Sequence, residues 1–224
     1  MIALISGLTA GLIHVFSGPD HLAAIAPLSL TRWRKAVVIG FRWGLGHSSG
    51  VLFVGLLALL FREIIPVDAI SSWGERCVGV MLIGIGLWGL KKCLSAHMHQ
   101  HEHSHEGDTH VHYHLHAHGH SAEKAKENPH QHSHAAFAVG TIHGVAGSSH
   151  FFGVLPALVF ATRIESISYL TAFGVGTILA MMIFSAAFGW LGQGLRWNLK
   201  YYKLAGSSIS MGAVALGVYW IATT

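Results

Sequence analysis

Residues 13–28 read IHVFSGPDHLAAIAPL, and this stretch governs how the rest of the chain is interpreted. It is an apolar run interrupted by His14, by the helix-breaking pair Gly18-Pro19 and by the polar pair Asp20-His21. Ionisable side chains are costly inside a lipid bilayer, and where they occur they commonly belong to a functional site. The stretch therefore predicts a polar site inside a membrane-spanning segment.

The composition indicates a membrane protein. Hydrophobic residues make up 52% of the 224 residues and charged residues only 11%, and the mean hydropathy is +0.50. An average soluble domain has about 25% charged residues. Several apolar runs reach the ~20 residues that a helix needs to cross a bilayer, which argues against the alternative of a soluble all-helical protein. The net charge of +4 is then expected to set membrane topology, and we expect no nucleic-acid partner.

We predict an all-α membrane protein with six transmembrane helices. Apolar runs that end at prolines or charged residues place these helices at about 2–28, 36–61, 73–94, 135–161, 166–193 and 202–222. Lys and Arg concentrate in the loops after the first, third and fifth spans, and such basic loops usually lie in the cytoplasm. Both termini are therefore predicted outside, and the long loop between the third and fourth spans inside.

That long loop, residues 96–134, is dominated by histidine and contains 14 of the 19 histidines of the chain. The loop histidines are His97, His99, His101, His103, His105, His110, His112, His114, His116, His118, His120, His130, His132 and His134. A tract of this composition cannot build a packed core, so we predict a disordered, metal-buffering loop. Imidazoles suit borderline divalent ions such as nickel, cobalt, copper or zinc. A merely solvating loop, the alternative, would favour Glu, Lys and Ser over His.

The chain also contains an internal repeat. At an offset of 129 residues, His14, Gly18, His21 and Pro27 fall on His143, Gly147, His150 and Pro156, and at an offset of 130, residues 44–47 fall on residues 174–177. Three predicted spans then lie in each half, residues 1–95 and residues 135–224. Because the number of spans in the first half is odd, the second half enters the membrane with the opposite orientation. Inverted repeats are typical of secondary transporters, whose sites lie near mid-membrane at broken helices. The alternative is chance similarity between glycine-rich apolar helices.

The first repeat unit predicts how its histidines could act together. His14 and His21 are seven residues apart, which is about 10.5 Å along a straight helix. Two imidazoles at that separation do not easily share one ion, because metal–nitrogen bonds are only about 2.1 Å long. A break at Gly18-Pro19 changes this, since proline removes a helix hydrogen bond and glycine accepts unusual backbone angles. We predict that the break folds Asp20 and His21 back toward His14 inside a protein-covered cavity.

The predicted metal ligands extend beyond this stretch. They are His14, Asp20, His21, His47, His143 and His150, with His47 as the third imidazole and the last two as counterparts from the second half. Another interpretation remains open for each. A single membrane histidine can be a hydrogen-bonded helix contact, and Asp20 could pair with Arg42 rather than with a metal ion.

Two motifs resemble the nickel/cobalt transporter superfamily. The first is His14-Val-Phe-Ser-Gly-Pro-Asp20-His21 followed by Leu-Ala-Ala-Ile-Ala-Pro, and the second is Gly40-Phe-Arg-Trp-Gly-Leu-Gly-His47-Ser-Ser. The chain is most similar to the NicO-type, high-affinity nickel-transport branch, which includes urease-accessory permeases. The resemblance implies that the histidines and the aspartate of these motifs contact the ion. The spacing from His14 to Asp20 is one residue longer here than in the better-known nickel permeases, which also have more spans.

We predict secondary transport of a divalent transition metal, Ni²⁺ or Co²⁺. Transport could be coupled to protons, because protonation of the ligands would release the ion. The alternatives are a membrane accessory protein that delivers or senses metal for a nickel enzyme, and a transporter of another ion such as Zn²⁺. A membrane metalloenzyme would need histidine boxes or His-Glu-x-x-His in or beside the spans, and neither is present, so we predict no enzymatic activity. No prosthetic group is expected. The expected partners are the transported ion, the bilayer and, for the accessory role, nickel-enzyme maturation proteins.

Overall fold

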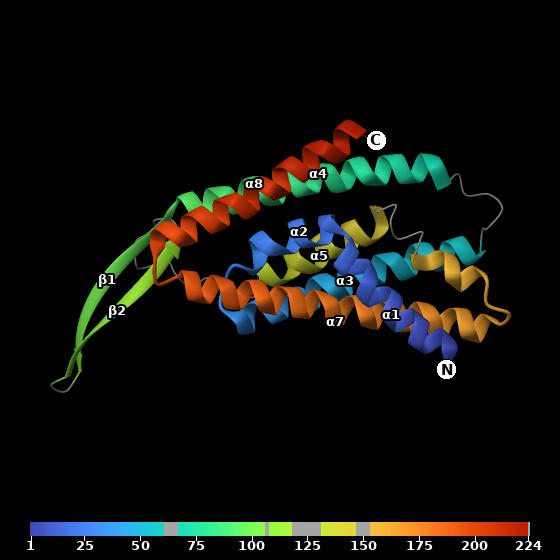
Figure 1. Ribbon diagram of the computed structural model, residues 1–224, viewed down its shortest axis with the longest axis horizontal. Coiled ribbons are helices and arrows are strands. Elements are labelled where there is room, and N and C mark those ends of the chain that lie inside the picture. The colour runs from blue at the N-terminus through green and yellow to red at the C-terminus, as the bar shows by residue number, and fades with distance from the viewer. Residues whose placement is uncertain (61–66, 106–107, 118–130, 147–152, 224) are drawn as a thin grey trace.

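The computed structural model describes residues 1–60, 67–105, 108–117, 131–146 and 153–223 (Figure 1). The helices in these ranges are α1 (Ile2–Ser17), α2 (Pro19–Ser29), α3 (Trp33–Leu60), α4 (Val67–Leu94), α5 (Gln131–Ala146), α7 (Arg163–Leu195) and α8 (Leu199–Thr223), with a short 3₁₀ turn, η1 (Leu155–Leu158). Two antiparallel strands, β1 (Ala96–His105) and β2 (Asp108–Ala117), form a hairpin between α4 and α5.

The chain is a multi-pass membrane protein, but six spans are not found among the described residues. α3, α4, α7 and α8 contain segments long and apolar enough to cross a bilayer, and the bent pair of α1 and α2 makes a fifth. The predicted fourth span, 135–161, is described only in part, because residues 147–152 lie outside the described residues. α5 ends at Ala146, and its apolar part, Ala135–Ala146, is shorter than the ~20 residues that a span needs. The described residues therefore give four or five spans.

Helices from the two halves of the sequence alternate in the centre of the molecule. α1 lies along α7, α5 lies along α3, and α3 also lies along α7. α4 and α8 form a separate pair that reaches the centre largely through α2 (Figure 1). The hairpin projects from one end of the bundle, and both chain termini lie toward the other end (Figure 1).

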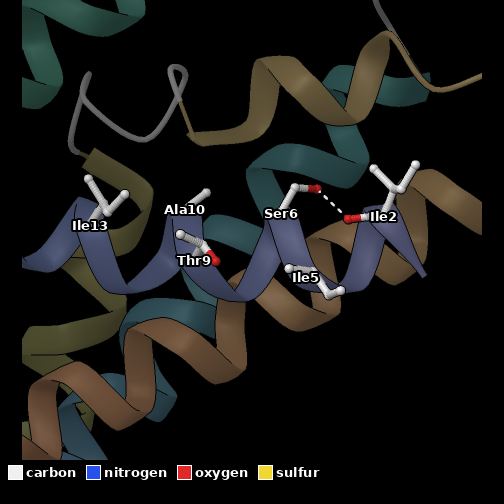
Figure 2. A pocket seen from close by; sticks show the side chains of 6 residues that line it. All are labelled: Ile2, Ile5, Ser6, Thr9, Ala10 and Ile13. Carbon is white, nitrogen blue, oxygen red and sulfur yellow. Dashed lines mark hydrogen bonds between the residues drawn. The ribbon is translucent and has the colours of Figure 1, made fainter.

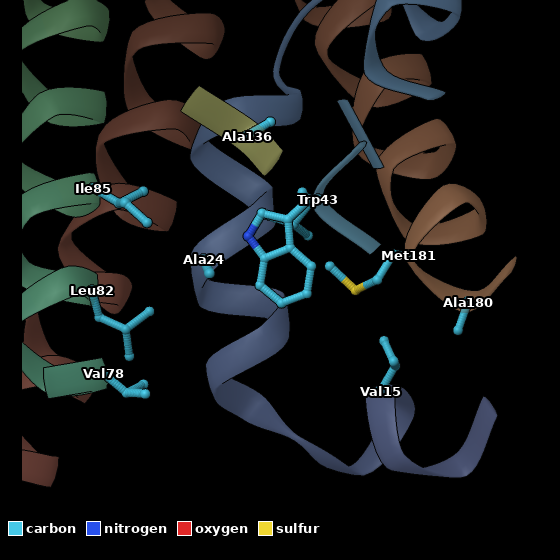
Figure 3. Close-up of a cluster of buried hydrophobic side chains, with 10 residues drawn as sticks. Val15, Ala24, Trp43, Val78, Leu82, Ile85, Ala136, Ala180 and Met181 are labelled. Atoms are coloured by element: carbon cyan, nitrogen blue, oxygen red, sulfur yellow. The ribbon is translucent and has the colours of Figure 1, made fainter. Parts of the chain in front are cut away.

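A buried apolar cluster joins these helices around Trp43 (Figure 3). Its members are Val15, Ala24, Ile25, Trp43, Val78, Leu82, Ile85, Ala136, Ala180 and Met181. The Trp43 side chain lies close to Met181 of α7 and Val15 of α1, while α2 stands between it and the side chains of α4. The cluster thus ties the α4–α8 pair to the centre by way of α2.

The outward faces of the helices carry exposed apolar side chains. On α1, Ile2, Ile5 and Ile13 are 80%, 62% and 58% exposed, and Figure 2 shows them with Ser6 beside a pocket on this helix. The Ser6 hydroxyl donates to the Ile2 carbonyl over 2.8 Å, so this polar group is satisfied within its own helix. Such a face suits contact with lipid, in which backbone and side-chain polar groups must be satisfied internally.

The close approach of α5 to α3 depends on two glycines. A Cβ atom on Gly140 would collide with the carbonyl oxygen of Trp43, and one on Gly144 would collide with the carbonyl oxygen of His47. Glycines at this small-xxx-small spacing let two helix backbones come into contact. Because Gly144 follows His143 directly, this contact also fixes His143 beside α3.

We expect Gly144→Ala to push α5 away from α3 and to destabilise the protein by about 1–3 kcal/mol, the usual cost of overpacking a tight interior. Gly212→Ala in α8 is the matched control, because a Cβ atom there meets nothing within 4 Å. Alanine also favours the helix over glycine by about 1 kcal/mol, so this control should unfold no earlier than the wild type. The measurement is the unfolding midpoint in one detergent, and equal midpoints for both variants would contradict the close contact.

The histidine-rich loop contains regular structure in the described residues, although we predict disorder from its composition. β1 and β2 pair along their whole length, from Ala96 opposite Ala117 to His105 opposite Asp108. The loop also ends earlier than predicted, because α5 begins at Gln131 and so includes His132 and His134. The predicted loop ligands His118, His120 and His130 lie outside the described residues.

Candidate metal centre

The first membrane segment breaks at Gly18. α1 ends at Ser17, Gly18 adopts φ −89° and ψ 101°, and α2 begins at Pro19 with a bend of 73° between the two helices. Proline suits the first position of a helix, because its missing N–H would have no intrahelical partner there. A Cβ atom at Gly18 would lie 2.8 Å from Asp20 Oδ1 and would also collide with the His21 ring. Glycine is therefore required where the chain turns around the site.

The bend brings His14 and His21 together. Their ring centroids lie 4.6 Å apart, whereas seven residues of straight helix would separate them by about 10.5 Å. His47 of α3 completes the group, with its ring centroid 4.9 Å from that of His21 and 5.7 Å from that of His14. One ligating atom from each of the three histidines lies within 4.8 Å of the others. Their arrangement can therefore place three nitrogens around one ion.

Asp20 connects this group to the second half of the chain. Its Oδ1 lies 3.0 Å from His21 Nδ1, and its Oδ2 lies 2.9 Å from His143 Nε2. All three side chains are buried, and together they form a second group with ligating atoms within 4.8 Å of one another. Among the described residues, the ion pairs of Asp20 are with these two histidines and not with Arg42.

Asp20 determines which nitrogen of His21 faces the imidazole of His47. An ionised carboxylate accepts hydrogen bonds and cannot donate them, so the proton of a neutral His21 lies on Nδ1. The other nitrogen, Nε2, lies 3.4 Å from His47 Nε2. Two ligand atoms that are each about 2.1 Å from a tetrahedral ion lie about 3.4 Å from each other, so this nitrogen–nitrogen distance suits a shared ion. A carboxylate behind a histidine is the usual arrangement that orients a metal ligand.

His150, the sixth predicted ligand, and Thr177, the counterpart of His47 in the repeat, are not part of the two groups. His150 lies outside the described residues. Thr177, which the repeat aligns with His47, is fully buried in α7, and its hydroxyl has no hydrogen-bond partner among the described residues. The structure thus brings together five of the six predicted ligands, His14, Asp20, His21, His47 and His143.

Two aromatic side chains beside the cluster are not singled out by the sequence motifs. Trp43 is fully buried and stacks on His47, with centroids 5.0 Å apart and an interplanar angle of 11°. It also meets His143 edge-on at 5.1 Å. Phe173 of α7 lies 5.4 Å from His14. Trp43 precedes His47 by four residues, which places both on one helix face, and this spacing is the signal that identifies it.

The fold and the site define a class, that of a multi-pass helical membrane protein with a buried cluster of histidines and one aspartate. Residues 44–219 match the model of the family described as "Cytochrome C biogenesis protein transmembrane region", and the chain belongs to this family. No solved structure matches the chain.

Three curated relatives cover most of this chain. Chloroplast protein FOR GROWTH AND FERTILITY 2 of Arabidopsis thaliana is 35% identical over 216 residues, or 95% of this chain and 54% of that protein. Chloroplast protein FOR GROWTH AND FERTILITY 1 of the same plant is 35% identical over 192 residues, or 85% and 50%. The chain spans about half the length of these two relatives. Urease accessory protein UreH of Bacillus sp. (strain TB-90) is 30% identical over 186 residues, or 82% of this chain and 74% of UreH.

Proposed function

We propose that this chain is a secondary transporter of a divalent transition-metal ion, Ni²⁺ or Co²⁺, with Zn²⁺ as the alternative cargo. The observation that carries the proposal is the convergence of His14, Asp20, His21, His47 and His143 from α1, α2, α3 and α5 in the interior of the bundle. Burying polar groups costs free energy unless they are hydrogen-bonded or bind a ligand. A purely structural contact would need far fewer of them.

The chemistry of the ligands favours a particular class of ion. Imidazole nitrogens suit nickel, cobalt, copper and zinc, whereas Mg²⁺ and Ca²⁺ prefer oxygen ligands. In this proposal His14, His21 and His47 hold the ion, and Asp20 orients His21 and supplies negative charge. His21 belongs to both buried groups, and Asp20 connects it to His143 of the second half.

Matching contacts in the two halves support an inverted repeat. His143 lies 5.1 Å from Trp43 where α5 meets α3, and His14 lies 5.4 Å from Phe173 where α1 meets α7. At the predicted offsets, His14 falls on His143 and Trp43 falls on Phe173, so the two contacts are counterparts. We infer a pseudo-two-fold relation between the halves, and rocking of one half against the other would open the site to alternate sides.

The distribution of basic residues supports an orientation in the membrane. The α2–α3, α4–β1 and α7–α8 connections lie at the hairpin end (Figure 1). They carry or adjoin Arg32, Arg34, Lys35, Lys91, Lys92, Arg196, Lys200 and Lys203. Cytoplasmic loops are rich in Lys and Arg. We therefore propose that the hairpin is cytoplasmic and both termini are outside, with protonation of the ligands as the step that releases the ion.

The name of UreH, a urease accessory protein, favours a second candidate in which the chain delivers or senses metal for a nickel enzyme. Transport accounts better for the broken helix and the buried ligands, because a membrane anchor needs neither.

The family description points to a further alternative, thiol exchange during cytochrome assembly. Such exchange needs two neighbouring cysteines. Cys77 is exposed and Cys93 is buried, and sixteen residues of α4 separate them by about 24 Å. We propose that the chain is not an enzyme.

Ion uptake into proteoliposomes tests the proposed function. We expect saturable uptake of Ni²⁺ or Co²⁺ well above that of protein-free liposomes. Mg²⁺ and Ca²⁺ in excess should not compete, because imidazole ligands discriminate against them. Uptake no greater than in protein-free liposomes, together with capture of a nickel-enzyme maturation protein, would favour the accessory role instead.

A further inference from the structure

Two arginines meet where the end of α7 packs against the connection between α2 and α3, at the hairpin end of the bundle (Figure 1). A Cβ atom on Gly192 of α7 would lie 3.0 Å from Leu30 and 3.2 Å from the backbone nitrogen of Thr31. Arg32 follows Thr31 directly, and Arg196 lies four residues after Gly192, which places it on the same face of the helix. Arg32 and Arg196, the arginine pair, therefore lie at one junction between the two halves of the chain.

Neither guanidinium of the arginine pair is neutralised within the part of the chain that the structure describes. The ion pairs found there join Asp20 to two histidines of the metal centre. Arg196 is half-buried, and its Nε is buried without a hydrogen-bond partner. Burial and the neighbouring charge of Arg32 lower the pKa of the Arg196 guanidinium below its ordinary value. A buried donor without an acceptor costs free energy, and an anion between the two arginines would remove this cost and their repulsion.

Three other polar groups at this end of the bundle already have partners. The guanidinium of Arg34 lies over the Trp33 ring, 5.5 Å from its centroid. The Asn198 side chain accepts from two backbone N–H groups in the first turn of α8. Lys203 Nζ donates to the Leu94 carbonyl over 2.9 Å. The arginine pair, rather than the start of α8 or these cations, is therefore the place where an anion would gain new hydrogen bonds.

The arginine pair lies at the level expected for lipid head groups. One candidate membrane span starts at Trp33 and another ends at Leu195, so Arg32 and Arg196 each lie one residue outside a span. Each arginine is also followed by an exposed tryptophan, since Trp33 is 45% and Trp197 is 78% exposed. Tryptophan is enriched at membrane–water interfaces, where its ring lies among the head groups. The anion most abundant at this level of an anionic membrane is the phosphate of a lipid.

We propose that the arginine pair binds the phosphate of an anionic phospholipid, so that one head group joins the α2–α3 connection to the end of α7. Guanidinium groups present planar sets of N–H donors that match phosphate oxygens. Hydrogen bonds between charged groups are about twice as strong as neutral ones. Because the two arginines come from different halves of the chain, the bound head group holds the halves together at this end of the bundle.

Native mass spectrometry of the full-length protein with added phosphatidylglycerol measures how tightly the first lipid binds. We expect Arg32→Gln and Arg196→Gln each to weaken this binding by at least about 10-fold, because each removes hydrogen bonds between charged groups. The unfolding midpoint of each variant in detergent shows whether it folds. Arg32 is exposed, so Arg32→Gln keeps the test decisive even if the half-buried Arg196 is needed for folding.

Arg34→Gln is the matched control, because it removes the same charge from the same connection, from a side chain that lies over Trp33. We expect this variant to bind phosphatidylglycerol nearly as tightly as the wild type. A diffuse attraction of basic residues to anionic lipid depends on their charge and not on their geometry. Equal losses in Arg34→Gln and Arg32→Gln would therefore overturn the site.

The double variant, Arg32→Gln with Arg196→Gln, tests whether the two arginines share one phosphate. Groups that share a partner have effects that depart from additivity, usually by about twofold or more in affinity. We expect the double variant to lose less affinity than the product of the two single losses. Losses that multiply would indicate two independent contacts and would overturn a shared site.

Inorganic phosphate in place of the lipid distinguishes the source of the anion. We expect it to bind the wild type much more weakly than phosphatidylglycerol, because it has no acyl chains to contact the apolar faces of the helices. Inorganic phosphate that binds as tightly as the lipid, and is lost in both arginine variants, would overturn the assignment to a lipid. Adding His21→Ala should leave lipid binding unchanged, which separates this proposal from the proposed transport site.

Discussion

Replacing His21 with alanine is expected to abolish high-affinity metal binding at the buried site and to reduce ion uptake to that of protein-free liposomes. His21 belongs to both buried groups. Its Nδ1 lies 3.0 Å from Asp20 Oδ1, and its Nε2 lies 3.4 Å from His47 Nε2. Loss of a partner behind a metal ligand costs roughly 10- to 100-fold in affinity, so loss of the shared ligand itself should exceed about 100-fold.

Further variants separate this effect from unfolding. His21→Gln keeps a polar side chain of similar reach beside Asp20 while removing the imidazole. His101→Ala removes an imidazole from β1, outside the buried site, and should leave uptake unchanged. Thermal unfolding of each metal-free protein identifies variants that fail to fold. Wild-type uptake by a folded His21→Gln protein would contradict the assignment of His21 as a ligand.

Asp20→Asn is expected to weaken metal affinity by roughly 10- to 100-fold, the usual range for a partner that orients a ligand. Asp20 accepts from His21 and lies 2.9 Å from His143 Nε2. An amide keeps the shape of the carboxylate but replaces one acceptor oxygen with a donor. One of the two histidine contacts must therefore change, and the negative charge that attracts a divalent ion is lost.

Titration of the protein with Co²⁺, followed by its visible absorption, measures this affinity. The band shape should be retained in Asp20→Asn if the nitrogen ligands stay in place. Ser49→Ala on α3 is the matched control, because the Ser49 hydroxyl donates to the Leu45 carbonyl of its own helix over 2.8 Å and belongs to neither buried group. Equal affinities for Asp20→Asn and Ser49→Ala would exclude Asp20 from the site.

The sequence predicts the local part of the site well. The break at Gly18-Pro19 follows from backbone chemistry that acts within a few residues. Once the break is assumed, a bend at Gly18 allows His14 and His21 to approach each other, and the structure has their centroids 4.6 Å apart. His47 is identified by its motif rather than by any calculation of distance.

The long-range part of the site is less accessible from sequence. The repeat nominates His143 as the counterpart of His14, but it does not predict a contact between His143 and Asp20, which are 123 residues apart. That contact exists because Gly140 and Gly144 let α5 lie against the backbone of α3. Helix pairing of this kind depends on which glycines face each other, and many glycines of the chain satisfy the same spacing.

Hydropathy and composition leave two other features of the chain unspecified. The apolar run of 135–161 predicts a continuous span, which stays a prediction because residues 147–152, directly after α5, lie outside the described residues. The composition of the histidine tract predicts disorder. Composition contains no information on strand register. The register of β1 with β2 is a pairing property, and it becomes visible only when both strands are placed together.

The most direct test of the central claim is X-ray absorption of Co²⁺ bound to a variant in which all fourteen loop histidines are replaced by glutamine. We predict one ion per chain with a first shell that includes three histidine nitrogens, at about 2.0–2.1 Å by analogy with zinc sites. The imidazole signature should disappear when His21→Ala is added. A first shell of oxygen alone, or the same shell with and without His21, would contradict a metal site at the broken helix.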